Sequence, residues 1–320
     1  MKFAIFVLSL FCLEAALGSV YAAEPQEAPK LADLVDDVRP SVVKIDLHIH
    51  GKVEEWPPQV PQGIRECFGE MQTCVVGTGY FVNSNGDVVT AFHVVDGYDG
   101  HPGVKQIIEL LNATGIHAEM KIGVAVPNIE RGKSVIGANT MSYSATLVST
   151  DPAHDIALIR STKNPFTSEP PLLIDAGAQS RSLGEPKFVT FSEARPRDAE
   201  DIFACGYPFG QHGLVTTSGT VASAWNSMPL VRAHAAGIDQ NTEVYQVDLR
   251  INPGDSGGPV FRVSDESVMG MAIEEIAGGG AGGLGIAIPA KFVTAFLKSQ
   301  GVPFTLAKTA PKDQPKQKPH

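Results

Sequence analysis

The sequence has few cations for its length. Its 320 residues include 25 Lys and Arg against 35 Asp and Glu, which gives a formal net charge of −10. Binding to nucleic-acid phosphates needs clusters of Lys and Arg, and no stretch combines such a cluster with interleaved aromatic residues. We therefore expect no nucleic-acid partner.

Long hydrophobic runs are also missing. The apolar run Phe3–Leu13 ends at Glu14, far short of the ~20 apolar residues that a membrane span needs. Lys2 precedes this run, and the segment that follows is rich in small residues and ends at Ala22, a pattern typical of a secretory signal peptide. We expect residues 1–22 to be removed and the mature protein to be periplasmic or secreted, without stable insertion into a membrane.

Cysteine is scarce, with four in the whole chain. In an oxidising compartment the close pair Cys67 and Cys74 is expected to form a disulfide around a short loop. Cys205 ends the apolar stretch 202–205 and is expected to be a buried hydrophobic side chain. The cysteines are not in a C-x₂-C spacing and no histidine cluster accompanies them, so we expect no metal site and no cofactor.

Glycine and proline are plentiful, at 32 and 23 residues, and favour many turns between short strands. A hydrophobic content of 43% with 19% charged residues is typical of a packed globular protein. The expected strands are 41–49, 75–82, 87–92, 202–205, 214–224, 243–249, 258–263 and 267–275. The expected helices are 31–38, 104–111 and 290–300. Asn85-Gly86 predicts a hairpin turn.

One stretch indicates chemistry: Asn252–Pro259, in which Ser256 lies among glycines at a tight turn between two strands. A serine hydroxyl attacks a carbonyl only when a base lies within hydrogen-bond reach. It also needs backbone N–H groups aimed at the oxyanion, and Gly254 lets the chain turn such groups outward. The competing interpretation is an ordinary glycine-rich turn.

A base and an acid precede this serine in the chain. His93 lies at the end of the apolar stretch 87–92, and Asp155 stands directly before a β-rich run. The order His93, Asp155, Ser256 is one of the known chain orders of a Ser-His-Asp triad. Asp96 is a second candidate for the acid, but it lies only three residues from the histidine. We therefore predict a triad of His93, Asp155 and Ser256, with the N–H groups of Gly254 and Ser256 as oxyanion hole.

These motifs resemble those of the chymotrypsin-clan serine proteases, and most closely the HtrA/Deg family. Further stretches carry the resemblance, namely 31–45, Gly77–Phe81, Cys205–Gly210, Thr217–Val221 and Gly283–Ala290. The resemblance implies an all-β fold of two six-stranded Greek-key β-barrels of trypsin-like architecture, with short N- and C-terminal helices.

The resemblance also implies the domain limits. A protease domain would span residues 23–305, with an N-terminal barrel at about 31–165 and a C-terminal barrel at about 185–300. A Lys- and Pro-rich tail, 306–320, is expected to be disordered. HtrA proteases usually carry one or two C-terminal PDZ domains, and we expect none in this sequence, because too few residues follow the expected protease domain. The segment between His93 and Asp155 is longer than is usual in the family, so 101–140 is expected to hold an insertion.

The primary substrate pocket is the least determined part of the site. In this clan its base lies six residues before the nucleophile, which here is Arg250. Ile251 follows it, and Met271, Ala272 and Ile273 are expected to line the facing wall. An Arg250 that points away leaves a shallow apolar pocket for Val, Ile, Ala or Leu. One that points inward would select Asp or Glu, but an unpaired buried guanidinium is costly.

The implied function is an exported serine endopeptidase that cleaves unfolded or misfolded proteins through an acyl-enzyme. Its partners would be protein or peptide substrates, and the resemblance implies a homo-oligomer, a trimer. The α/β-hydrolase alternative needs a histidine after the serine, and only the terminal His320 follows Ser256. A second alternative stays open: a catalytically quiescent, protease-fold binding or chaperone-like protein, because HtrA proteases can rest with a disordered oxyanion loop.

Overall fold

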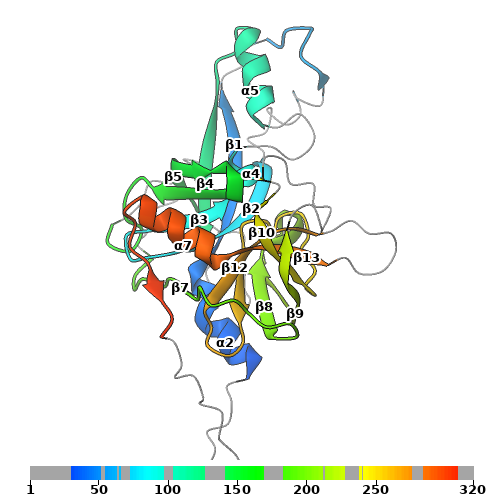
Figure 1. Ribbon diagram of the computed structural model, residues 1–320. Helices are drawn as coiled ribbons and strands as arrows, with labels where there is room; N and C mark the ends of the chain where they lie inside the picture. Colours follow the sequence, from blue (N-terminus) through cyan, green and yellow to red (C-terminus); the bar gives the residue numbers. More distant parts are fainter. Residues whose placement is uncertain are drawn as a thin grey trace, which may run out of the picture.

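A computed structural model gives the architecture of most of the chain (Figure 1). It describes residues 30–51, 55–62, 65, 73–96, 104–126, 141–168, 183–211, 213–227, 238–239, 241–275 and 284–308. Within these ranges the side chains of residues 73–75, 104, 141, 227, 274 and 275 are not described. The expected signal peptide, the expected Cys67–Cys74 disulfide and the tail from 309 onward therefore lie outside the described residues.

The first half of the chain folds into a closed antiparallel barrel with the strand order β1-β2-β3-β6-β5-β4. Its strands are β1 (Val42–Gly51), β2 (Thr73–Phe81), β3 (Asp87–Ala91), β4 (Ala118–Val126), β5 (Met141–Asp151) and β6 (Ile156–Ser161). Alternation in β1 directs Val43, Ile45 and Leu47 into the hydrophobic core. The expected 87–92 strand is confirmed except at its last residue, because Phe92 already begins a helix.

The second barrel has the strand order β11-β8-β9-β10-β13-β12 and is closed by pairing of β11 with β12. Its strands are β8 (Asp201–Gly206), β9 (Val215–Ser227), β10 (Glu243–Val247), β11 (Pro259–Arg262), β12 (Val268–Glu275) and β13 (Gly285–Pro289). Two short strands, β7 (Thr190–Phe191) and β14 (Thr305–Leu306), add in parallel beside β12. The expectation of two six-stranded barrels is confirmed.

Short helices complete the fold: α2 (Leu31–Val38), α4 (Phe92–Val95), α5 (Val104–Ala113) and α7 (Ala290–Ser299), with 3₁₀ turns η1 (Arg39–Ser41), η2 (Pro152–His154) and η3 (Pro208–Gly210). Helix α5 covers the ends of β1 and β4 that extend beyond the barrel (Figure 1), where Ile107 and Leu111 pack with Ile49 and Ala118. The expected helix in the 101–140 insertion is thus confirmed. No helix within the described ranges is long and apolar enough to span a membrane.

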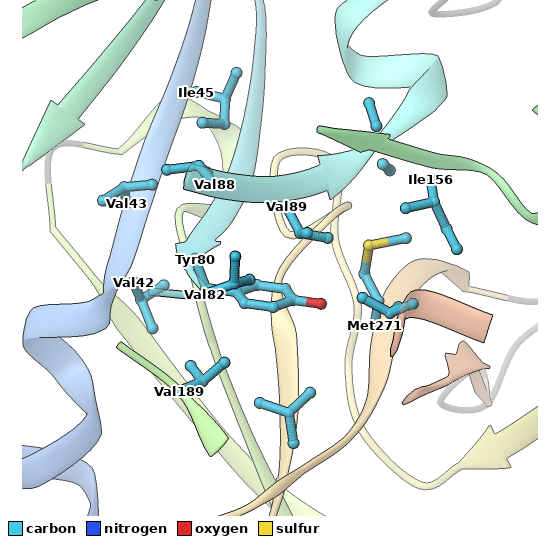
Figure 2. Close-up of a cluster of buried hydrophobic side chains, with 14 of the residues drawn as sticks. Val42, Val43, Ile45, Tyr80, Val82, Val88, Val89, Ile156, Val189 and Met271 are labelled. Atoms are coloured by element: carbon cyan, nitrogen blue, oxygen red, sulfur yellow. The ribbon is translucent and has the colours of Figure 1, made fainter. Parts of the chain in front are cut away.

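One hydrophobic core joins the two barrels. Tyr80, Val89 and Ile156 of the first barrel lie beside Met271 of β12 in the second, and each of these side chains is completely buried (Figure 2). Helix α7 adds to this contact, since it packs on β12 and β13 and also on β6. The barrels are therefore fixed against each other, and groups from both can form one site.

Candidate active site

His93 is placed by the end of strand β3. Because β3 pairs with β6 as far as Ala91 and Ile156, the residues that continue from this pair, Phe92 and Asp155, come together. The Phe92 N–H donates to the Asp155 carbonyl at 3.0 Å, and His93 follows in the first turn of α4. The His93 side chain is 23% exposed, so its imidazole is partly accessible from solvent.

Asp155 meets His93 through both of its carboxylate oxygens. Oδ2 lies 2.7 Å from Nδ1 of His93, and Oδ1 accepts the His93 backbone N–H at 2.9 Å. The Asp155 side chain is buried, and its backbone adopts a left-handed conformation with φ 56° at the end of η2. Asp is among the residues that tolerate this conformation best. A proton on Nδ1 directed at the carboxylate makes Nε2 the basic nitrogen of the ring.

The second barrel holds the turn that carries Asp155. The Ala153 carbonyl accepts the Asp239 N–H at 3.0 Å and the Thr242 hydroxyl at 3.1 Å. His154 contacts Oδ2 of Asp151 through Nδ1 at 2.7 Å, and its ring stacks on Phe292 of α7 with centroids 4.3 Å apart. These contacts connect the strand edge of the first barrel to the closing helix.

Asp96, the second candidate for the acid, is oriented elsewhere. It follows the last residue of α4, and its carboxylate lies 4.0 Å from the Lys105 ammonium. Its side chain is 36% exposed, whereas both Asp155 oxygens contact His93. The geometry therefore favours Asp155 as the partner of the imidazole.

Ser256 lies in the turn that leads into β11. Its hydroxyl donates to the Ile273 carbonyl of β12 at 2.8 Å. Gly254, two residues earlier, has φ 101°, and a Cβ at this position would lie 2.4 Å from the Tyr207 carbonyl oxygen. Only glycine combines such a φ with so close an approach of another backbone.

Four consecutive carbonyl groups of this turn accept hydrogen bonds, three from donors elsewhere in the protein and one from within the turn. They are Pro253 (Phe209 N–H, 2.6 Å), Gly254 (Thr78 hydroxyl, 2.7 Å), Asp255 (Gly258 N–H, 2.9 Å) and Ser256 (Thr78 N–H, 2.9 Å). Within the described part of the chain, the N–H groups of Gly254 and Ser256 have no hydrogen-bond partner. Two neighbouring unpaired donors can receive an oxyanion.

Asp255 is the only ionisable group within this turn. Its Oδ2 accepts the N–H of Asn252 at 2.9 Å, while burial raises the pKa of its carboxyl to about 6. It lines a cavity of about 10 Å³ together with Cys205, Arg250 and Ala272. A cavity of this size holds about one water molecule.

The residues expected to line the substrate pocket differ in their placement. Arg250 is exposed, whereas Ile251 is buried. A Cβ on Gly285 would lie 2.5 Å from Cδ1 of Ile251, so this side chain packs directly on the β13 backbone. Met271 points into the core between the barrels (Figure 2), and we therefore leave it out of the pocket. Ala272 and Ile273 are buried, and Ala272 lines the cavity beside Asp255.

Cys205 is a free, buried thiol, as expected from the sequence. Burial raises its pKa to about 11, which keeps the sulfur protonated and unreactive at neutral pH. Within the described residues, no group of three or more His, Cys, Asp or Glu side chains is placed to hold a metal ion.

Sequence reasoning missed two residues that contact the Ser256 turn, Thr78 and Phe209. Phe209 is 68% exposed and has φ 53°, an unusual conformation for a bulky residue, and nothing in its sequence context predicts it. Thr78 did carry a signal, because it stands between Gly77 and Gly79 inside a strand. Glycines at such positions often mark a close approach of another backbone.

Comparison with known proteins agrees with this architecture. Residues 77–271 match the family model of the trypsin-like peptidase domain. The chain is 28% identical over 296 residues to the periplasmic serine endoprotease DegP of Salmonella typhimurium, covering 89% of this chain and 54% of the relative. A probable periplasmic serine endoprotease DegP-like of Pseudomonas putida is also 28% identical, over 305 residues, with coverages of 88% and 51%.

The chain thus spans about half the length of the curated relatives that it matches. A third relative, the probable DegP-like endoprotease of Rickettsia conorii, is 26% identical over 294 residues, which cover 84% of this chain and 46% of that protein. The double barrel, the family match and these relatives agree, and the chain belongs to the trypsin-like peptidase family, with homology to the DegP/HtrA periplasmic serine endoproteases.

Proposed function

We propose that this protein is an exported serine endopeptidase in which Ser256, His93 and Asp155 form the catalytic triad. The observation that carries the proposal is the pair of contacts from His93 to the two oxygens of Asp155. Homology to periplasmic serine endoproteases supports the same activity. The unpaired N–H groups beside Ser256 supply the second element that acyl transfer needs.

In the proposed reaction the Ser256 hydroxyl attacks the scissile carbonyl carbon. Its proton, shared with the Ile273 carbonyl in this structure, passes to Nε2 of His93. His93 then returns that proton to the leaving amine, and the C–N bond breaks to give an acyl-enzyme and a free amino terminus. A water molecule, deprotonated by His93, then attacks the acyl carbon. The ester bond breaks, the acid product leaves, and His93 returns the proton to Ser256. Asp155 keeps the imidazole in one tautomer and stabilises the imidazolium.

The Gly254 and Ser256 N–H groups are proposed to bind the oxyanion of each tetrahedral intermediate. Loss of one such donor typically lowers kcat by about 10²–10³. Because the four carbonyls of the turn are already held, these donors are oriented before substrate arrives. The reaction needs no cofactor.

For the primary pocket we propose an apolar, shallow form. Ile251 packs on Gly285, which narrows the space for a large substrate side chain. Arg250 lines the small cavity beside Asp255 but is exposed, so we propose that its guanidinium stays in water and does not form the pocket floor. The pocket would then accept Val, Ile, Ala or Leu before the cleaved bond.

Unfolded or misfolded proteins are the proposed substrates, since an exported protease with a small apolar pocket meets exposed aliphatic segments mainly in such chains. By resemblance to HtrA proteases we expect a homotrimer, which sedimentation analysis of the mature protein tests.

Casein cleavage by purified mature protein tests the proposed function. The wild type is expected to cleave casein and to react covalently with a fluorophosphonate at Ser256. Ser256→Ala should lose both activities, while Ser299→Ala, at the end of α7, serves as the matched control. A wild type that neither cleaves casein nor reacts with the probe would overturn the proposal in favour of a quiescent binding or chaperone-like protein.

A further inference from the structure

Thr78 of β2 is completely buried where the first barrel meets the Ser256 turn. Its hydroxyl donates to the Gly254 carbonyl at 2.7 Å and accepts the Tyr207 N–H at 3.0 Å. Its own N–H donates to the Ser256 carbonyl at 2.9 Å, and its carbonyl accepts the Thr90 hydroxyl at 2.6 Å. Every polar group of Thr78 is therefore engaged, and two of its bonds end on the turn.

The two bonds fix alternate peptide planes of the turn. The Gly254 carbonyl belongs to the plane between residues 254 and 255, and the Ser256 carbonyl to the plane between 256 and 257. Between them lies the plane that carries the Ser256 N–H. Because a peptide is planar, its N–H points opposite to its carbonyl, and fixing the planes on either side restricts the φ and ψ rotations through which it could turn over. Thr78 thus holds both neighbours of the plane that presents this N–H.

Close packing adds to this hold. A Cβ on Gly257 would lie 2.3 Å from the Thr78 carbonyl oxygen, and one on Gly258 would lie 3.2 Å from Cγ2 of Thr78. The turn therefore contacts Thr78 along its backbone, without a side chain in between. Thr78 and Gly254 are separated by 176 positions and belong to different barrels.

We propose that Thr78 is a positioning residue for the oxyanion hole: from the first barrel, its hydroxyl and N–H hold the Gly254 and Ser256 carbonyls so that the Ser256 and Gly254 N–H groups face the substrate. The inference rests on the proposed protease function. It gives the first barrel a second role, since this barrel then shapes the oxyanion hole as well as supplying His93 and Asp155.

Removal of the hydroxyl separates this role from packing. Thr78→Val keeps the side-chain shape but leaves the Gly254 carbonyl and the Tyr207 N–H without their partner. Thr78 then holds the turn only through its N–H bond to the Ser256 carbonyl. We expect kcat to fall at least about tenfold, towards the ~10²–10³ of a lost oxyanion donor, while KM changes less than about twofold. Thr78→Ser keeps the hydroxyl, and its kcat should stay within about threefold of the wild type.

The experiment measures kcat and KM on a peptide that the wild type cleaves, together with the rate of phosphonylation of Ser256 by a fluorophosphonate. Thr294→Val is the matched control, because Thr294 is equally buried and its hydroxyl bonds Glu193, away from the turn. Thermal unfolding establishes that each variant is folded at the assay temperature. Should Thr78→Val fail to fold, Thr78→Cys, with a weakly donating thiol of similar size, takes its place.

A loss of kcat and of phosphonylation rate in Thr78→Val, with rescue in Thr78→Ser, supports the proposal. A folded Thr78→Val, or Thr78→Cys in its place, with wild-type kcat overturns it. An equal loss in Thr78→Ser also overturns it, since packing would then be the cause. A wild type without cleavage and without phosphonylation overturns the protease function and this inference together, whereas the variant results in an active protein bear on Thr78 alone.

Discussion

Nδ1 of His93 and Oδ2 of Asp155 lie 2.7 Å apart, although 62 positions separate the two residues. The contact forms because β3 and β6 are neighbours in the first barrel, and β3 ends where β6 begins. The backbone N–H of His93 reaches the other carboxylate oxygen at 2.9 Å. The carboxylate therefore fixes both the position of the histidine backbone and the tautomer of its ring.

Asp155→Asn is the most selective substitution of the proposed triad. The amide keeps the shape of the carboxylate but favours the wrong imidazole tautomer, and kcat should fall by about 10⁴. Asp96→Asn is the control and should retain wild-type kcat, because Asp96 faces Lys105. Steady-state kinetics on a cleaved peptide measure kcat of both variants. An active Asp155→Asn with an inactive Asp96→Asn would reverse the assignment of the acid.

Asp255 is expected to make stability depend on pH. Its folded-state pKa of about 6 lies above the ordinary 3.8, so between these values the folded protein binds a proton that the unfolded chain has released. Stability should therefore fall as pH rises from about 4 to about 6. Above that range the charged carboxylate costs on the order of 1–2 kcal/mol, after allowance for its partial contact with water.

Asp255→Asn removes that charge and should raise the free energy of unfolding by on the order of 1–2 kcal/mol at pH 7.5, with little change at pH 4. Urea unfolding at both pH values measures the difference. Asp201→Asn, at an exposed position, is the control. A gain of the same size at both pH values would show that burial of the charge is not its cause.

Ile251 should set the size of the substrate pocket. Ile251→Ala removes the side chain that packs on Gly285, so cleavage after larger residues such as Phe should increase relative to cleavage after Val. Mass-spectrometric mapping of cuts in an unfolded substrate measures the preference. Met271→Ala should lower stability by about 2–5 kcal/mol without changing the preference, because Met271 lies in the core. Predominant cleavage after Asp or Glu in the wild type would contradict an apolar pocket.

The cysteines should differ in their reaction with an alkylating reagent. Cys205 is buried with a raised pKa, so it should be labelled only after unfolding. A Cys67–Cys74 disulfide would protect both thiols until a reductant is added. Intact-mass analysis of the unfolded mature protein should show one label without reductant and three with it. Three labels without reductant would exclude the disulfide.

Much of the architecture follows from local patterns. Asn85-Gly86 marks the hairpin between β2 and β3, Gly86 having the required positive φ of 82°. The helices at 31–38 and 290–299 follow from their apolar spacing. The sequence did not predict β4 or β5. Both lie in or directly after the insertion, and β4 pairs with β1, which is distant in the sequence.

The residues of the candidate site also differ in how far the sequence predicts them. His93, Asp155 and Ser256 stand in motifs whose residue types indicate their chemistry, so the sequence alone suggested them. Thr78 makes its contacts across 176 positions, and such contacts leave no local trace beyond the flanking glycines. The sequence analysis placed Met271 on the pocket wall. Alternation along β12 does not say whether a side chain faces the pocket or the core between the barrels, and Met271 lies in that core.

The position of a fluorophosphonate adduct shows directly whether Ser256 is the nucleophile. The folded protein is treated with the probe, digested, and its modified peptides are sequenced by mass spectrometry. A single adduct is expected on Ser256. It should not form when the protein is heat-unfolded before treatment, and it should be strongly reduced in His93→Ala, since the serine depends on that base. An adduct on another serine, or an unmodified wild type, would contradict this expectation.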